Sequence, residues 1–135
     1  MIGVLIITHG RFGSELLRTA EDIVGRQSQA AAIDVTSEMG PEGLGQAIEL
    51  ALQSLSGPEG ILILVDMLGG TPCNASLLKT KDLKAHVLTG VNLYMALSVF
   101  RHRASLDLDA LASKSAEDGR RSITLAADLL KKRLS

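Results

Sequence analysis

The sequence VLIITHGRFG, residues 4–13, indicates how the rest of the chain folds. A continuous apolar run at residues 2–7 ends in Thr8-His9-Gly10, and an amphipathic pattern begins just after Gly13. We therefore predict a strand over residues 2–8, buried on both faces of a parallel sheet, followed by a tight turn and a helix over residues 13–24. His9 lies at the turn, at the carboxyl end of the strand, where open α/β sheets bind ligands.

The same alternation of strand and helix patterns continues along the chain. Further strands are predicted at residues 30–35, 61–65 and 85–88, with helices at 41–55, 71–80 and 92–100. Thr71 is the predicted N-cap of the third helix and Pro72 its first residue. The last apolar pattern keeps helical spacing from Asp107 through Gly119 to Leu130, which predicts one continuous helix. These patterns predict a single domain, residues 1–135, of the α/β class: three layers, with a mostly parallel, doubly wound sheet and helices on both faces.

The composition excludes several classes of protein. Hydrophobic residues make up 46% of the 135 positions, enough for a core, but aromatic residues make up only 2% and the formal net charge is −1. This combination argues against nucleic-acid binding, which favours basic patches and aromatic platforms. Cys73 is the single cysteine, so an intrachain disulfide is excluded and a reducing compartment fits. No apolar run approaches the roughly 20 residues of a membrane span, and no signal peptide is recognised, so we expect a cytoplasmic protein.

Polar residues and glycines follow three of the predicted strands. They are Thr8-His9-Gly10, Asp66 with Gly69-Gly70-Thr71, and Thr89-Gly90 before Asn92. Because the carboxyl ends of parallel strands share one edge of the sheet, we expect His9, Asp66, Thr71 and Asn92 to converge. Asp66 would accept a proton from one ring nitrogen of His9, which leaves the other nitrogen as a nucleophile. Helix N-termini and the Thr71 hydroxyl would stabilise an arriving phosphoryl group.

Plainer interpretations of the same residues stay open. His9 could be a capping or solvent-exposed residue, Asp66 could simply cap a helix, and Gly69-Gly70 could be a loop without a ligand. His86 is interpreted as structural, His102 as a surface residue and Cys73 as a small packing or lining residue. No cluster has the spacing of a zinc site, so no metal is expected.

The residues at these strand ends resemble the EIIA component of the mannose-family sugar phosphotransferase system (PTS), the type 4 EIIA domain. The likeness spans nearly the whole chain. It is carried by Ile7-Thr8-His9-Gly10 with Leu16-Leu17 and Ala20-Glu21, by Val65-Asp66 and Gly69-Gly70-Thr71-Pro72-Cys73-Asn74-Ala75, and by Gly90-Val91-Asn92-Leu93.

The resemblance implies a phosphoryl carrier of the phosphoenolpyruvate-dependent system. His9 would accept the group from phospho-HPr, Asp66 would orient His9, and Thr71 would supply the active-site hydroxyl. The phosphate-binding residues would be Gly10, Gly69, Gly70 and Asn92. The resemblance also implies a homodimer, transfer to an EIIB protein, only an indirect link to the membrane permease, and no metal or organic cofactor.

The chain departs from the family pattern in three places. Some members carry EIIB through a linker, whereas this sequence stops at Ser135, so EIIB is expected to act in trans. Some members exchange a C-terminal strand between subunits, which the helical pattern here does not favour. Tyr94 stands where the family typically has proline.

Alternative functions share some of these features. A regulatory phosphohistidine protein would use the same chemistry, and the phosphotransferase subunit of dihydroxyacetone kinase has a similar domain. A tetrapyrrole metal chelatase can also begin with a strand followed by His-Gly, and a binding module could hold an anion without turnover.

Overall fold

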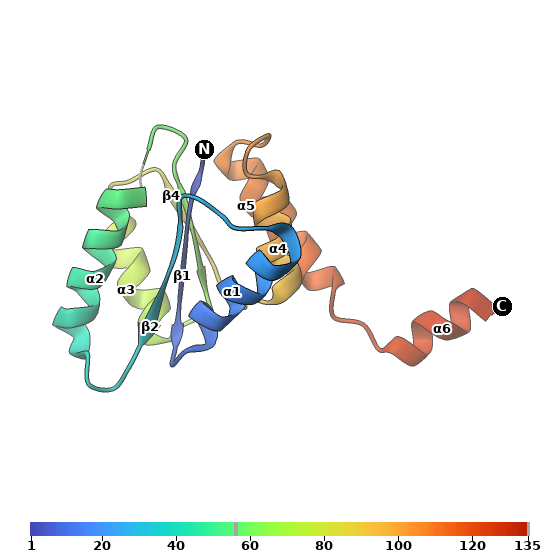
Figure 1. Cartoon of the computed structure of the whole chain (residues 1–135). Coiled ribbons are helices and arrows are strands. Elements are labelled where there is room, and N and C mark those ends of the chain that lie inside the picture. Colours follow the sequence, from blue (N-terminus) through green and yellow to red (C-terminus); the bar gives the residue numbers. More distant parts are fainter. Residues whose placement is uncertain (56, 135) are drawn as a thin grey trace.

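The sheet has four parallel strands in the order β2-β1-β3-β4. The computed structural model describes residues 1–55 and 57–134 (Figure 1). The strands are β1 (Gly3–His9), β2 (Ala30–Val35), β3 (Ile61–Val65) and β4 (Ala85–Leu88). The predicted strands are therefore all present, within a residue or two of the expected bounds.

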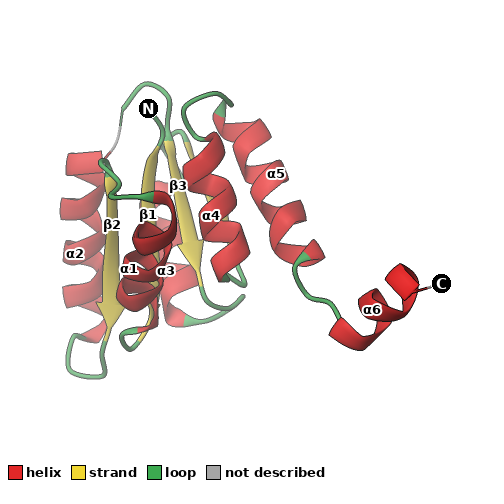
Figure 2. Cartoon of the chain, turned by 45° about the vertical axis from the view of Figure 1, so that its right-hand side comes forward, coloured by secondary structure: helices red, strands yellow, loops and turns green. Residues whose placement is uncertain are grey.

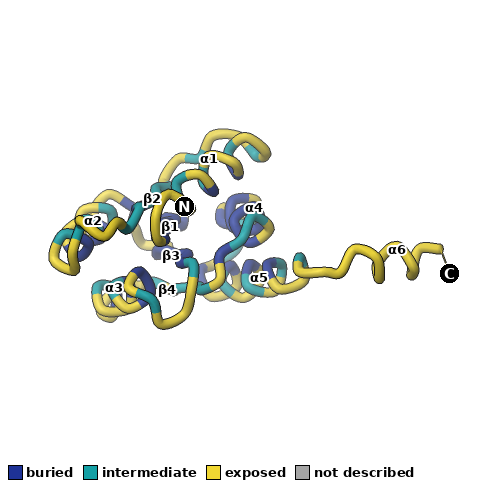
Figure 3. Tube along the Cα trace, turned by 90° about the horizontal axis from the view of Figure 1, so that it is seen from below, coloured by how far each residue is buried: buried dark blue, intermediate teal, exposed yellow. Residues whose placement is uncertain are grey.

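Helices cover both faces of this sheet. They are α1 (Phe12–Val24), α2 (Gly40–Leu55), α3 (Thr71–Thr80), α4 (Leu93–His102), α5 (Leu108–Arg121) and α6 (Ala126–Leu134). Helices α2 and α3 lie on one face, whereas α1, α4 and α5 lie on the other (Figures 2 and 3). The predicted three-layer α/β fold is confirmed.

The two faces of β1 explain why the strand is apolar throughout. Val4 and Ile6 belong to the core under α1, α4 and α5, whereas Leu5 and Ile7 belong to the core under α2 and α3. All four side chains are fully buried. Successive side chains of a strand point to opposite faces, so a strand between two helical layers must be apolar at every position.

The strand order places the switch point of the sheet at the carboxyl ends of β1 and β3. From β1 the chain passes through α1 to β2 on one side, and then returns to β3 on the other side of β1. His9 pairs with Val35 in the register of β1 and β2, and Ile7 pairs with Val65 in the register of β1 and β3. His9 and Asp66 therefore follow neighbouring strands at the crevice where doubly wound folds bind ligands.

The prediction of one continuous helix after Asp107 is wrong. Asp107 does cap α5, because its side chain accepts the N–H of Ala110, but α5 ends at Arg121 and α6 begins at Ala126. The hydroxyl of Ser122 donates back to the carbonyl of Gly119 over 2.6 Å. The β-branched Ile123 and Thr124 follow, so local hydrogen bonding and low helix propensity combine to end the helix.

Two details of the predicted helix boundaries also change. Helix α3 begins at Thr71 with Gly70 as its N-cap, so Thr71 is not the cap as predicted and Pro72 is the second helical residue. Gly119 lies inside α5, where a Cβ would meet the Cβ of Met95 at 3.2 Å. The glycine lets α5 approach α4 closely, which explains a residue that otherwise weakens a helix.

Within residues 1–55 and 57–134, no helix is long and apolar enough to cross a membrane.

Candidate active site

One carboxylate oxygen holds both the backbone and the ring of His9. The N–H of His9 donates to Oδ2 of Asp66 over 2.9 Å, and ring Nδ1 lies 2.7 Å from the same oxygen. A carboxylate only accepts hydrogen bonds, so the proton of this contact lies on Nδ1. In the neutral ring the second nitrogen, Nε2, then carries a lone pair. The side chain of His9 is 50% exposed, so a partner can reach the ring.

Asp66 is suited to this role because it stays ionised. It follows β3 directly, its side chain is only 15% exposed, and its other oxygen, Oδ1, accepts the N–H of Met67 over 3.0 Å. Partial burial raises the pKa of the Asp66 carboxyl, but the hydrogen bonds and the charge of His9 outweigh it and hold that pKa below its ordinary value. The carboxylate therefore remains available to accept from Nδ1 at neutral pH.

Gly70 forms the surface against which the ring lies. A Cβ built at Gly70 would stand 3.1 Å from Cε1 of His9 and 3.1 Å from Cγ of Met67. The backbone of Gly70 is in an extended conformation that any residue adopts, with φ −77°. The glycine is thus required by space around His9 rather than by its own backbone angles.

The first turn of α3 begins at this contact. Gly70 is the N-cap and Thr71 the first helical residue, and the N–H of Asn74 closes the turn on the carbonyl of Gly70 over 3.0 Å. The N–H groups ahead of Asn74 have no acceptor within the helix, and the N-terminus carries partial positive charge. The arrangement favours an anion beside His9.

A pocket of about 360 Å³ opens beside the ring. His9 and Thr71 contribute to its wall, together with residues from the end of β2 and the start of α2: Val35, Thr36, Ser37, Gly40, Pro41 and Leu44. The predicted site did not include the residues that follow the second strand, although their position in the sequence indicated them. The second strand ends at the same edge as the other parallel strands, so Thr36 and Ser37 belong with the polar residues that follow them.

Thr8 is a second residue that sequence reasoning did not single out as functional. It is fully buried, and its hydroxyl oxygen accepts the N–H of Gly13 over 2.6 Å. A Cβ on Gly13 would stand 2.9 Å from that oxygen. The pair joins the first turn of α1 to the end of β1, and so positions the turn that carries His9.

The other predicted phosphate-binding residues are engaged in structural contacts. The N–H of Gly10 donates to the carbonyl of Val35 over 2.9 Å, and the carbonyl of Gly69 accepts from the side chain of Asn74 over 3.3 Å. Gly10 and Gly69 both have positive φ, at 59° and 78°, which accounts for glycine in these two turns.

The amide of Asn92 is turned toward α5. Its Oδ1 accepts the N–H of Met95 over 2.9 Å, which caps α4, and its Nδ2 donates to the carbonyl of Gly119 over 3.2 Å. The predicted start of the helix at Asn92 is correct, but both polar atoms of the side chain are used in joining α4 to α5. We therefore leave Asn92 out of the candidate site.

The remaining histidines and Cys73 lie in structural contacts. Nε2 of His86 on β4 is 2.6 Å from Oδ1 of Asp109 on α5, and Nδ1 of His102 is 2.8 Å from the carbonyl of Ser98. Cys73 is buried in the core under α2 and α3. Among residues 1–55 and 57–134, no three His, Cys, Asp or Glu side chains come together as a metal site.

Comparison with known families gives one matching model over most of the chain. The family model EIIA-man, described as PTS system fructose IIA component, matches residues 3–116. Among curated proteins, the mannose-specific EIIAB component of Escherichia coli is 32% identical over 124 residues, which are 90% of this chain and 38% of that protein. The chain thus spans well under half the length of this relative.

Two further relatives match nearly end to end. The fructose-specific EIIA component of Bacillus subtilis is 29% identical over 133 residues, 98% of this chain and 91% of that protein. Among solved structures, the EIIA component from Streptococcus agalactiae superimposes with a TM-score of 0.85 at 29% identity, covering 95% of this chain and 99% of that one.

Proposed function

Because the chain belongs to the EIIA family of the mannose and fructose phosphotransferase systems, we propose that it is a phosphoryl carrier of sugar uptake whose acceptor atom is Nε2 of His9. In this proposal phospho-HPr is the donor and an EIIB protein or domain is the acceptor, and transfer takes place in the cytoplasm. The observation that carries the proposal is the double contact of Asp66 Oδ2 with the N–H and Nδ1 of His9.

The contact prepares Nε2 for attack on phosphorus. The lone pair of Nε2 forms the new N–P bond, while the bond between phosphorus and HPr breaks and its electron pair returns to HPr. The proton on Nδ1 stays where it is, so the step needs no general base. The phosphorylated ring gains positive charge, which the carboxylate of Asp66 stabilises at 2.7 Å from Nδ1. Transfer to EIIB is the same step in reverse with a different partner.

Neighbouring groups are placed to stabilise the phosphoryl oxygens. Gly70 brings the N-terminus of α3 against the ring, and Thr71 lines the same pocket as His9. We propose that the N–H groups of the first turn and the hydroxyl of Thr71 donate to the oxygens as charge develops on them. Gly69 acts by shaping this turn, and Gly10 by shaping the turn after β1.

We also propose that the carrier is a homodimer, as the family implies. Surface that a second copy could cover remains on this chain: β4 is an outermost strand with a backbone edge that is unpaired within the described part of the chain, and the apolar side chains of Ile123 and Leu125 are 80% and 69% exposed. Light scattering on the purified chain measures the mass directly, and a monomer at the concentrations of the transfer assay contradicts this part of the proposal.

Phosphorylation of His9 is tested with phosphoenolpyruvate, the first enzyme of the system and HPr. We expect the wild type to take up one acid-labile, base-stable phosphate, and His9→Ala to take up none. His86→Ala is the matched control, because the side chain of His86 is 46% exposed and also contacts an aspartate, but lies outside the pocket. Asp66→Ala should slow labelling while the chain remains folded.

The opposite results are equally clear. If an active donor leaves the wild type unlabelled, or if His9→Ala is labelled as fast as the wild type, the proposed acceptor is wrong. If Asp66→Ala keeps the wild-type rate, Asp66 does not orient His9.

A further inference from the structure

Helix α6 differs from the rest of the molecule in its exposure. Each of its residues is exposed, and the helix projects away from the sheet and its covering helices (Figures 1 and 3). Apolar side chains are nevertheless frequent along it. Leu130 is 58% exposed and Leu134 is 81% exposed, while Leu129 is 49% exposed. Soluble proteins usually bury such side chains, so a run of them on one projecting helix indicates a binding surface.

Three apolar side chains of α6 lie on one stripe. Ala126, Leu130 and Leu134 are spaced four residues apart, so they share one face of the helix. At 100° per residue, Lys131 and Arg133 fall on the two edges of this stripe. An apolar stripe bordered by cations is typical of helices that lie in the headgroup region of a bilayer.

Charge is divided unevenly between residues 120–135, which begin with the last two residues of α5 and include α6, and the rest of the chain. Residues 120–135 hold five of the 14 Lys and Arg but only one of the 15 Asp and Glu, a formal charge of +4. Residues 1–119 hold the remaining nine and fourteen, a formal charge of −5. An anionic surface therefore attracts α6 and repels the rest of the molecule, which would orient the chain with α6 toward that surface.

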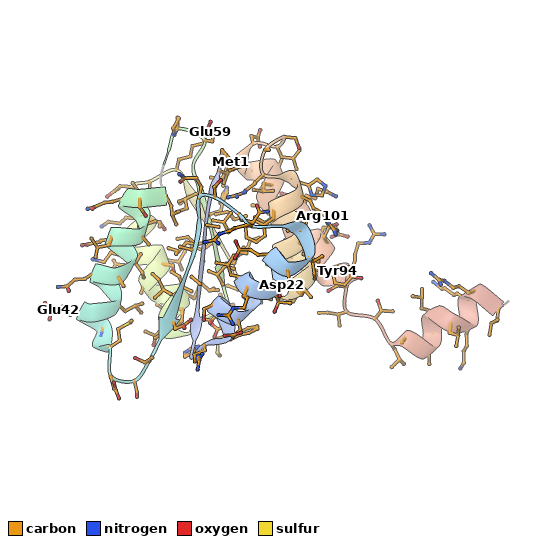
Figure 4. All side chains as sticks on the ribbon, viewed as in Figure 1. Met1, Asp22, Glu42, Glu59, Tyr94 and Arg101 are labelled. Carbon is orange, nitrogen blue, oxygen red and sulfur yellow. The ribbon has the colours of Figure 1, made fainter. Side chains whose placement is uncertain are left out.

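A pocket at the start of α6 involves only some of the apolar side chains of this helix. A pocket of about 530 Å³ separates α6 from α4 and the end of α5, and Ala126 and Leu129 line it together with Tyr94 and Arg101 (labelled in Figure 4). Leu130 and Leu134 are not among its lining residues. Ala126 at the start of the stripe therefore lies at the pocket, whereas the two exposed leucines of the stripe lie outside it.

We propose that α6 is an interfacial helix that binds the chain to membranes rich in anionic phospholipids. Leu130 and Leu134 enter the headgroup region, and Lys131 and Arg133, at the edges of the stripe, contact phosphate groups. A short helix with few apolar side chains binds weakly by itself, so both the apolar and the basic parts are needed and binding is reversible. The inference goes beyond the proposed function and does not depend on it, because binding requires no phosphoryl transfer.

The test uses the purified full chain and vesicles made of equal parts phosphatidylglycerol and phosphatidylcholine. We expect the chain to sediment with these vesicles but not with vesicles of phosphatidylcholine alone. Raising the salt from about 0.1 M to about 1 M should release it, since the Debye length falls from about 10 Å to about 3 Å. Combined Lys131→Gln and Arg133→Gln should lower the partition coefficient about 25-fold, at about a factor of five for each cation.

Matched variants test whether vesicle binding depends on α6 itself or on any exposed leucine or cation of the surface. Leu130→Ser with Leu134→Ser should also release the chain, whereas Leu77→Ser with Leu78→Ser on α3 should not, although Leu77 and Leu78 are 53% and 65% exposed. Neutralising the exposed cations Arg18, Arg26 and Lys81 should likewise leave binding intact. Labelling of His9 should be unchanged in the α6 variants, and His9→Ala should bind vesicles as the wild type does.

Three results overturn the proposal. The first is a wild-type chain that stays in the supernatant with anionic vesicles. The second is equal binding by the wild type and by the variant with Lys131→Gln and Arg133→Gln. The third combines two observations: the wild type does not bind vesicles, and substituting Leu130 and Leu134 changes the mass of the protein in solution. That result would assign the stripe to contact with a second copy of the chain.

Discussion

Two neighbours position the ring of His9: a carboxylate oxygen of Asp66, which accepts from it, and Gly70, which has no side chain to occupy the space of the ring. Asp66 Oδ2 fixes the orientation of the ring and the position of its proton, and Gly70 leaves the space that the ring occupies. Both contacts are made within the chain itself, so the ring is already oriented for the proposed phosphoryl transfer. The site is therefore preorganised, which is the property that makes electrostatic stabilisation effective.

Gly70→Ala should slow phosphorylation of His9 about tenfold, because displacement of a reacting group by a fraction of an ångström weakens positioning. The added Cβ would stand 3.1 Å from Cε1 of His9, so the ring must shift. The free energy of unfolding should change by less than about 1 kcal/mol, because φ at Gly70 suits alanine. Initial rates of labelling and urea unfolding measure the two quantities.

Gly69→Ala is the matched control for this substitution. Gly69 has φ +78°, but a Cβ there would meet no atom within 4 Å. We expect a loss of about 1 kcal/mol in stability from the left-handed backbone, with a smaller effect on the rate than that of Gly70→Ala. Equal rates for the wild type and Gly70→Ala would show that the ring tolerates the methyl group.

The carboxylate of Asp66 should make stability depend on pH. Its pKa in the folded chain is lower than in the unfolded chain, so the ionised group stabilises the folded state. This contribution is complete above the unfolded pKa of about 3.9 and is lost as the pH falls through the folded pKa. The difference in unfolding free energy between the wild type and Asp66→Asn should therefore shrink as the pH falls below about 4. A difference that stays constant down to low pH would contradict the lowered pKa.

At the scale of elements, Arg103 joins the end of α4 to the amino ends of β1 and β2, whereas His9 lies at the carboxyl end of β1. The side chain is 3% exposed, and its guanidinium donates to the carbonyls of Ile2, Ser28 and Gln29 and to the side chain of Gln27. The charge also lies 5.3 Å from the centre of the Phe100 ring. These contacts join α4, the connection between α1 and β2, and the start of β1.

Arg103→Met should cost about 3 kcal/mol of stability, because the substitution removes a buried guanidinium that holds four acceptors and leaves the buried carbonyl of Ile2 without this donor. Arg101→Met is the control, since Arg101 is exposed one residue before the end of the same helix and should change stability by less than about 0.5 kcal/mol. Urea unfolding of both variants measures the difference. Similar stabilities for the two variants would show that the carbonyls find other partners.

The break between α5 and α6 has consequences for the whole molecule. A continuous helix would have carried its apolar spacing along one face from Leu108 to Leu130. Because α5 ends at Arg121, its buried residues pack on α4 and β4 while α6 points elsewhere. The cations of α6, Lys131, Lys132 and Arg133, are thereby held apart from an acidic body, which is the basis of the proposed interaction with anionic membranes.

The sequence alone determined the parallel sheet and the edge of that sheet on which His9 and Asp66 lie. Residues 2–7 and 61–65 are apolar at every position, and such runs fold only as strands or helices buried between two layers. Once the strands are parallel, their carboxyl ends share one edge of the sheet, which places His9 and Asp66 on that edge. Their direct contact also depends on the strand order, in which β1 lies beside β3.

Only the tertiary structure decided where the remaining side chains point. Asn92 follows a strand as the site residues do, yet its amide joins α4 to α5, and Gly70 serves the ring of His9 rather than its own backbone. The end of α5 at Arg121 depends likewise on the bond of Ser122 to Gly119. Side-chain direction and helix ends depend on distances between elements that are remote in sequence or on single hydrogen bonds. Periodicity, which averages over many residues, contains neither.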